Sequence, residues 1–125
     1  MSSSEFAVIL AAGMGTRMQS AMAKVLHPIC GRSLVGHVVA AARGAGLHPV
    51  IVLHHQASAV RENLGAENID FVRQEIPRGT GDAVRAALAA LPREGTVIVM
   101  AGDAPLLRSE TITALRAAHG DNAVT

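Results

Sequence analysis

The sequence predicts an α/β fold in which a mostly parallel sheet is covered by helices on both faces. Strand-length apolar runs alternate with helical segments four times along the chain, which is the order of β–α units in a parallel sheet. The first run, residues 6–12 (FAVILAA), is apolar throughout, as is typical of a strand buried on both sides. Phe occurs twice and Trp and Tyr do not occur, so the core must be built from Val, Ile, Leu and Ala.

The first half of the chain is expected to hold two strands and two helices. The strand at 6–12 leads into a loop over 13–23. Ser33 is placed to cap a helix that runs to Arg43, and the glycines that follow end it. The second strand covers residues 49–55 (PVIVLHH), and a short helix at 58–64 closes at Gly65.

The second half repeats this order. Residues 69–74 (IDFVRQ) alternate as a third strand, and a helix begins at Thr80 or Asp82 and reaches Leu91. Residues 96–101 (TVIVMA) form the fourth strand. Ser109 is expected to cap the last helix, which ends near His119. Right-handed crossovers should connect the strands.

One domain accounts for the 125 residues, of which 50% are hydrophobic and 17% charged, a balance that excludes a disordered chain. We expect residues 1–5 to be a disordered N-terminus and residues 6–125 to form the domain. Because residues 123–124 could begin another strand after the last helix, the sequence also suggests a fragment of a longer chain.

Several classes of protein are excluded by composition. The single cysteine, Cys30, rules out an internal disulfide framework and a cysteine-based zinc cage, and it is expected to be buried or half-buried. Adjacent His54 and His55 point to opposite faces of a strand, which disfavours a zinc pair. No apolar run is long enough to span a membrane, and the N-terminus lacks the basic start of a signal peptide, so we expect a cytoplasmic protein. The 2% aromatic content disfavours nucleic-acid binding by base stacking.

Charge is unevenly distributed, although the net charge is only +1. Residues 6–61 contain no Asp or Glu but include Arg17 and Lys24, whereas most acidic residues follow. A basic N-terminal half suggests an anionic ligand, with solvated surface cations as the plainer interpretation.

Three loops follow strands, where open α/β sheets bind ligands. The first, LAAGMGTRM over residues 10–18, has Gly13 and Gly15, which allow close backbone approach to phosphate, or simply a tight turn. It matches neither GxxxxGK[ST] nor GxGxxG.

The second loop, QEIPRGTGD over residues 74–82, offers glycines beside Thr80 and a carboxamide on Gln74 that suits an imide edge. The alternative is a Pro/Gly loop with a threonine helix cap. The third loop is AGDAPLL over residues 101–107. Asp103 there is a good ligand for Mg²⁺, or else bonds to its own turn.

Four ordered segments, LAAGMGTRM, KVLHPICGRSLVGHVV, QEIPRGTGDAV and AGDAPLL, resemble the nucleotidyltransferase domain of bacterial N-acetylglucosamine-1-phosphate uridylyltransferases. These enzymes usually carry an acetyltransferase domain as well. The resemblance covers residues 6–125 but only about the first half of that catalytic domain. It implies a Rossmann-like three-layer α/β/α fold, of which this chain is the N-terminal part.

The resemblance also implies roles for individual residues. Arg17 would stabilise the departing pyrophosphate, Lys24 would bridge the phosphates of nucleotide and sugar, and Asp103 would hold Mg²⁺. The remaining residues would contact UTP. Backbone groups of four residues would hold uridine: Leu10, Ala11, Ala12 and Gly13. Gln74, Gly79 and Thr80 would contact uracil, and Gly102 would lie near the nucleotide sugar. The reaction would join UTP to N-acetylglucosamine 1-phosphate, for cell-wall precursor synthesis.

Two positions depart from the family. Ala23 stands where proline commonly precedes the lysine, and Ala101 replaces an aromatic residue before Gly-Asp. The parts that would bind the sugar and supply a second metal ligand have no counterpart in these residues. Two alternatives therefore stay open: a related sugar-phosphate nucleotidyltransferase with another base or sugar, and a catalytically silent nucleotide-binding fragment. Uncovered strand edges would favour self-association or marginal stability, and the sequence leaves the oligomeric state, including a homo-oligomer, open.

Overall fold

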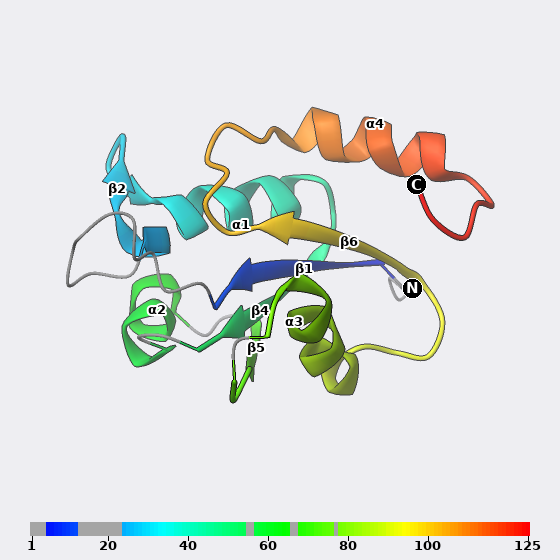
Figure 1. The fold of residues 1–125 in the computed structure, drawn as a ribbon. Helices are drawn as coiled ribbons and strands as arrows, with labels where there is room; N and C mark the ends of the chain where they lie inside the picture. Colours follow the sequence, from blue (N-terminus) through cyan, green and yellow to red (C-terminus); the bar gives the residue numbers. More distant parts are fainter. Residues whose placement is uncertain (1–4, 13–23, 55–56, 66–67, 77) are drawn as a thin grey trace.

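The computed structural model describes residues 5–12, 24–54, 57–65, 68–76 and 78–125. Its main sheet has four parallel strands in the order β5-β4-β1-β6. These are β1 (Glu5–Ala11), β4 (His48–Leu53), β5 (Asp70–Arg73) and β6 (Thr96–Ala101). The arrowheads of β1, β4 and β6 point to the same end of the molecule in Figure 1. The predicted parallel α/β fold is confirmed.

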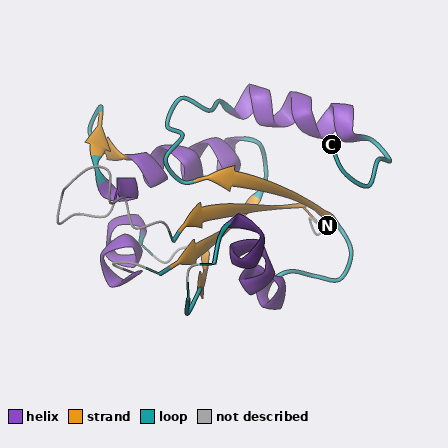
Figure 2. Ribbon diagram, in the orientation of Figure 1, coloured by secondary structure: helices purple, strands orange, loops and turns teal. Residues whose placement is uncertain are grey.

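Helices lie on both faces of the sheet, as Figure 2 shows. Helices α1 (Leu34–Gly44), α2 (Ala57–Leu64) and α4 (Ser109–His119) pack on one face, and α3 (Thr80–Ala87) packs on the other. A short 3-10 turn, η3 (Leu88–Ala90), continues α3, so the helix predicted to reach Leu91 changes its winding after Ala87.

The core follows the apolar runs seen in the sequence. Ala7, Val8 and Ile9 of β1 are fully buried because β1 is central and covered on both sides. Ala7 and Ile9 face α1 and α4, whereas Val8 faces α3. Alternate residues of one strand thus contribute to two separate apolar layers.

Strand and helix boundaries differ slightly from those predicted. Strand β1 begins at Glu5, which was expected to belong to a disordered N-terminus, and Arg116 Nε lies 3.1 Å from its carboxylate. Residues 1–4 lie outside the described part of the chain. Strand β4 ends at Leu53, two residues before the predicted end, and α2 begins at Ala57 rather than at residue 58.

A two-stranded hairpin was not predicted. Strands β2 (Pro28–Ile29) and β3 (Arg32–Ser33) pair in antiparallel fashion after a 3-10 turn, η2 (Lys24–Leu26). Both turn residues have positive φ, 52° at Cys30 and 78° at Gly31, as in the tight turns of two-residue hairpins. The prediction that Cys30 is buried or half-buried is wrong, because the turn places it at an exposed tip.

The two predicted serine caps have different outcomes. Ser33 caps α1 as expected, with its hydroxyl oxygen accepting a hydrogen bond from the Gly36 backbone N–H at 3.1 Å. Ser109 does not cap α4, since it is the first helical residue and its hydroxyl donates to the Ala41 carbonyl oxygen at 2.8 Å. This bond joins α4 to α1. The cap position itself is Arg108, which makes no side-chain cap bond.

Candidate functional site

The predicted site residues that the structure describes gather at the carboxyl edge of the sheet. Ala12 follows β1, Gln74 follows β5, and Gly102 and Asp103 follow β6. Lys24 opens η2 next to this edge, where it contacts Asp103. Gly13 and Arg17 lie outside the described residues, so their predicted roles stay predictions.

Lys24 and Asp103 form an ion pair, with Lys24 Nζ 2.8 Å from Asp103 Oδ2. Both side chains are partly exposed, 43% and 34% respectively, so this pair adds at most about 1 kcal/mol to stability. The contact brings a cation and a carboxylate from distant parts of the chain to the end of β6. Their exposure leaves both groups accessible to a ligand.

Backbone packing explains why these two charges meet. The Gly102 N–H donates to the Leu10 carbonyl oxygen at 2.9 Å, which holds the residue before Asp103 against the end of β1. A Cβ on Gly102 would lie 2.7 Å from that oxygen and 3.3 Å from Val25 Cγ1. Buried Val25 follows Lys24 in η2. Only glycine allows β6, β1 and η2 to approach this closely.

Residues 10–12 sit at the centre of this edge. Leu10 lies between Val52 of β4 and Ala101 of β6 in the sheet register. Ala11 and Ala12 are buried, 1% and 6% exposed, so a ligand would meet their backbone and not their side chains. The expected contacts between a ligand and the backbone of these residues stay a prediction.

Gln74 is buried, 3% exposed, and is held at three points. Its backbone N–H donates to the Leu53 carbonyl oxygen at 2.7 Å, and its carbonyl oxygen accepts from His54 Nδ1 at 2.9 Å. Its side-chain Nε2 donates to Asp82 Oδ2 at 2.9 Å. The carboxamide therefore has a fixed place beside β5.

Gly79 and Thr80 form the entry to α3 next to Gln74. Gly79 has φ +103° and occupies the cap position, and Thr80 is the first helical residue, so the proposed threonine cap is wrong. Both residues are exposed. A shallow pocket of about 340 Å³ lies here, and its lining includes Gln74, Arg78, Asp82 and Arg85.

The donor chemistry at Asp103 fits a hard divalent cation. No group of three or more acidic, His or Cys ligands occurs among the described residues, so the protein offers no closed cage there. Mg²⁺ usually binds through one or two carboxylates together with substrate phosphates and water. A single half-exposed carboxylate beside a lysine suits that mode, in which phosphate supplies further oxygens.

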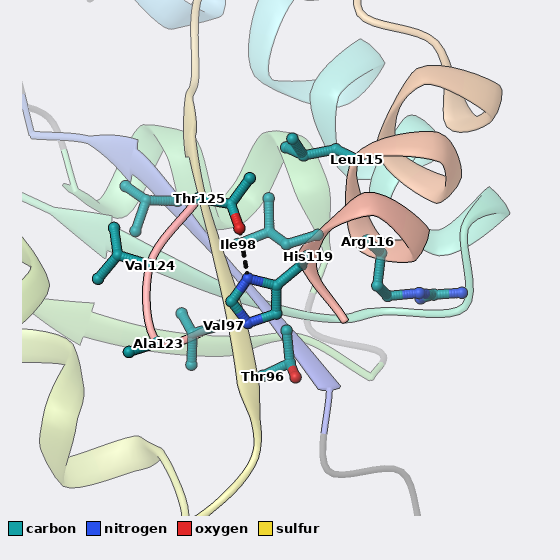
Figure 3. Close-up of a pocket in the computed structure, with 10 residues that line it drawn as sticks. Thr96, Val97, Ile98, Leu115, Arg116, His119, Ala123, Val124 and Thr125 are labelled. Atoms are coloured by element: carbon teal, nitrogen blue, oxygen red, sulfur yellow. Dashed lines mark hydrogen bonds between the residues drawn. The ribbon is translucent and has the colours of Figure 1, made fainter. Parts of the chain in front are cut away.

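A second pocket, of about 330 Å³, lies away from these residues (Figure 3). It is formed by β6, α4 and residues 123–125, and Figure 3 shows His119 bonded to Thr125 within it. The His119 Nδ1 to Thr125 Oγ1 distance is 2.7 Å. Its lining is largely apolar and includes Val97, Val99 and Leu115, and no predicted site residue contributes.

Two site neighbours were not identified from the sequence. His54 was considered only as half of a histidine pair, and Asp82 only as a helix start. The sequence signal for each was its position, since His54 directly follows β4 and Asp82 lies in the first turn of α3. Their partner, Gln74, could be assigned only once the strand order was known.

Comparison with known proteins identifies the family of this chain. A family model described as "MobA-like NTP transferase domain" matches residues 7–125. Bifunctional protein GlmU from Kineococcus radiotolerans is 54% identical over 125 residues, covering 94% of this chain and 26% of that protein. The chain thus spans about a quarter of the length of the curated relatives it matches. These relatives confirm the resemblance indicated by the four sequence motifs.

Solved structures confirm the fold. The crystal structure of Rv0371c from Mycobacterium tuberculosis H37Rv has a TM-score of 0.81 and 28% identity, covering 94% of this chain and 61% of that one. The structure of Rv0371C in complex with manganese has a TM-score of 0.77 at 28% identity, with coverage of 94% and 60%. None of the helices in the described part of our chain has the length and apolar character that crossing a bilayer requires. On sequence and fold together, the chain belongs to the family of MobA-like NTP transferase domains.

Proposed function

We propose that this chain is the nucleotide-binding part of an enzyme that transfers uridylyl from UTP to N-acetylglucosamine 1-phosphate. The products are UDP-N-acetylglucosamine, a cell-wall precursor, and pyrophosphate. The observation that carries the proposal is the Lys24–Asp103 pair at 2.8 Å, placed at the carboxyl edge beside the end of β1. The family match and the GlmU relatives support the reaction class.

The strand order supports a single elongated ligand. Gln74 follows β5 at one edge of the sheet and Asp103 follows β6 at the other, with β4 and β1 between them. Neighbouring strands lie about 4.8 Å apart, so the two ends of this line are separated by about 14 Å. A ligand that reaches both must be long, as a nucleoside triphosphate is. In this arrangement uracil lies by Gln74, Gly79 and Thr80, and the phosphates lie by Lys24.

The chemistry needs positioning and charge more than a protein nucleophile. A phosphate oxygen of the sugar 1-phosphate attacks the α-phosphorus of UTP, the bond from that phosphorus to the bridging oxygen breaks, and pyrophosphate leaves with the electron pair. Lys24 lowers the repulsion between the two polyanions and stabilises negative charge on the transferring group, and we assign Arg17 to the departing pyrophosphate. Leu10, Ala11, Ala12, Gly13 and Gly102 hold the nucleoside. When bound at Asp103, Mg²⁺ supplies further charge neutralisation and orients the phosphates.

Both substrates are highly charged and do not cross membranes unaided, so we place the reaction in the cytoplasm. The partners we propose are small molecules, with neither nucleic acid nor a membrane among them.

The test is release of pyrophosphate from UTP, Mg²⁺ and N-acetylglucosamine 1-phosphate by the native gene product. Asp103→Ala should lower the rate by about a hundredfold or more, since the residue proposed to hold Mg²⁺, and with it the charge neutralisation that the metal would supply at the phosphates, is removed. Asp121→Ala, at an exposed acid after α4, is the matched control and should leave the rate unchanged. No release by the unchanged protein, or an equal rate with Asp103→Ala, would contradict the proposal.

Two alternatives are separated by this assay together with calorimetry. Faster turnover with dTTP, CTP or another sugar phosphate would indicate a related sugar-phosphate nucleotidyltransferase. Calorimetric binding of UTP without turnover would indicate a catalytically silent nucleotide-binding fragment. One observation favours the silent fragment as a description of these 125 residues alone: they span about a quarter of the length of the curated relatives.

A further inference from the structure

The side chain of Gln74 is hydrogen-bonded to the carboxylate of Asp82, and this bond determines which way the amide group faces. Gln74 Nε2 lies 2.9 Å from Asp82 Oδ2, and Gln74 is only 3% exposed while Asp82 is half-buried. Both residues line the shallow pocket between the end of β5 and the start of α3. The pair therefore belongs to the wall that a ligand at this end of the sheet would meet.

An ionised carboxylate only accepts hydrogen bonds, whereas a carboxamide has a donor side and an acceptor side. The amide of Gln74 must turn its NH₂ toward Asp82, because the opposite orientation would bring two acceptor oxygens together in a buried place. Asp82 lies in the first turn of α3, where the positive end of the helix dipole favours its negative charge. The carboxamide oxygen, on the side of the amide away from Asp82, is then placed to accept a hydrogen bond from a ligand, and the second N–H stays available as a donor.

The backbone of Gln74 is fixed as well. Its N–H is hydrogen-bonded to the Leu53 carbonyl oxygen at the end of β4 and its carbonyl oxygen to His54, so the point from which the side chain extends is fixed. Backbone bonds set where the side chain starts, and Asp82 sets which atom it presents. These are separate contacts from separate elements, β4 and α3.

We propose that Asp82 is a positioning residue that makes Gln74 an acceptor toward the base, and thereby selects uracil over cytosine. This inference rests on the function proposed above. Uracil carries an N–H at ring position 3, which donates to the carboxamide oxygen. Cytosine carries a bare nitrogen at that position, which would face the oxygen as a second acceptor. Sites built around a hydrogen bond discriminate strongly against ligands that leave it unpaired.

A merely structural role for Asp82 makes a different prediction. If the carboxylate only ties the loop to α3, its removal lowers stability and weakens all nucleotides alike. If it orients Gln74, its replacement changes the preference between UTP and CTP. The ratio of the two affinities therefore separates the two roles.

The experiment compares Asp82→Asn, Asp82→Glu and the unchanged chain. Asparagine can donate as well as accept, so both orientations of Gln74 become accessible, and the ratio of UTP to CTP affinity should fall by about five- to tenfold. Glutamate keeps an acceptor-only group and should retain the preference. Glu110→Gln removes an acid from the first turn of another helix, α4, and should leave the ratio unchanged. Affinities are measured by calorimetry in the presence of Mg²⁺.

A second readout needs no nucleotide. In amide-resolved NMR of the free chain, the side-chain N–H of Gln74 that faces Asp82 should be shifted downfield and should exchange slowly with solvent, and both effects should weaken in Asp82→Asn. A Gln74 side-chain amide in the unchanged chain with the shifts and exchange rate of an exposed glutamine would overturn the orientation claim whether or not UTP binds. An unchanged UTP to CTP ratio in Asp82→Asn would overturn the selectivity claim while leaving the proposed function in place. Failure of the unchanged chain to bind UTP would instead overturn the selectivity claim together with the proposed function.

Discussion

Lys24 and Asp103 neutralise each other in the nucleotide-free chain, although we assign them to different groups of the ligand. With Nζ at 2.8 Å from Oδ2, the ammonium already occupies one of the contacts that this carboxylate could offer to a cation. We therefore expect Lys24 to compete with a metal ion for Asp103 in the absence of nucleotide. A triphosphate resolves this competition, because its oxygens give Lys24 another partner and add ligands for the metal.

This competition can be measured with Lys24→Met. Without nucleotide, affinity for Mn²⁺ should rise by up to about fivefold, the equivalent of a partly exposed ion pair. Affinity for UTP should fall by at least about tenfold, because a charged hydrogen bond to phosphate is lost. Electron paramagnetic resonance measures the first and calorimetry the second. Arg108→Met, which breaks the exposed 3.6 Å contact with Glu110, serves as control. Weaker Mn²⁺ binding by Lys24→Met would refute the displacement.

Gly102 affects the same site because its lack of a side chain lets β6 approach β1 closely. A methyl group there would meet the Leu10 carbonyl oxygen at 2.7 Å, so Gly102→Ala must push β6 away from β1. We expect a loss of about 1–3 kcal/mol in unfolding free energy, as for other overpacked sites. Gly81→Ala, where a Cβ meets open space at the start of α3, should be neutral or slightly stabilising. Equal effects of the two changes in urea unfolding would count against this account.

At the scale of elements, two serines show how far local sequence determines local structure. Ser33 directly precedes α1 and acts as its cap, whereas Ser109 is the first residue of α4 and caps nothing. Ser33 also donates to Asn63 Oδ1 at 2.7 Å, which links α1 to α2. Ser109 finds a carbonyl of α1 instead, a partner that exists only once α4 has packed on α1.

Ser33→Ala should therefore lower the unfolding free energy by about 1–2 kcal/mol, since one cap and one inter-helix bond are lost together. Ser58→Ala, an exposed position inside α2, should change it by less than about 0.5 kcal/mol. Thermal and urea unfolding measure both variants. A loss no larger than that of the control would show that the cap contributes little here.

The elements themselves were largely predictable, and their partners were not. The four strands follow from continuous or alternating apolar runs, and β6 has the predicted bounds of Thr96 and Ala101. The β2–β3 hairpin was missed because its strands are two residues long and Cys30 is an unusual residue for positive φ. The Gln74–Asp82 and Lys24–Asp103 contacts depend on strand order and loop path, which no local pattern encodes.

At the scale of the whole molecule, the two edges of the sheet are protected to different degrees. The β5 edge carries charged Asp70 and Arg73, whereas β6 (TVIVMA) carries no charge. Val97 and Val99 of β6 are 39% and 46% exposed. They lie on the same face of the sheet as α3, but α3 does not cover them. Charged residues discourage edge-to-edge pairing, and apolar edges invite it.

We accordingly expect the isolated chain to self-associate as its concentration rises. Val99→Lys should shift sedimentation velocity profiles toward monomer by placing a charge on β6. Thr113→Lys, which adds the same charge on an exposed position of α4, should not. A monodisperse monomer of the unchanged chain across the concentration series would show that β6 is adequately protected.

Strand β1 has a further consequence for how the protein is made. It precedes both of its partner strands in the sequence, pairing with β4 on one side and β6 on the other, so that Phe6 lies opposite both His48 and Val97. During translation its second side stays unpaired until β6 has also emerged from the ribosome. An apolar strand is thus left with one unpaired side while the segments up to β6 are made, and we expect a nascent-chain chaperone to bind there.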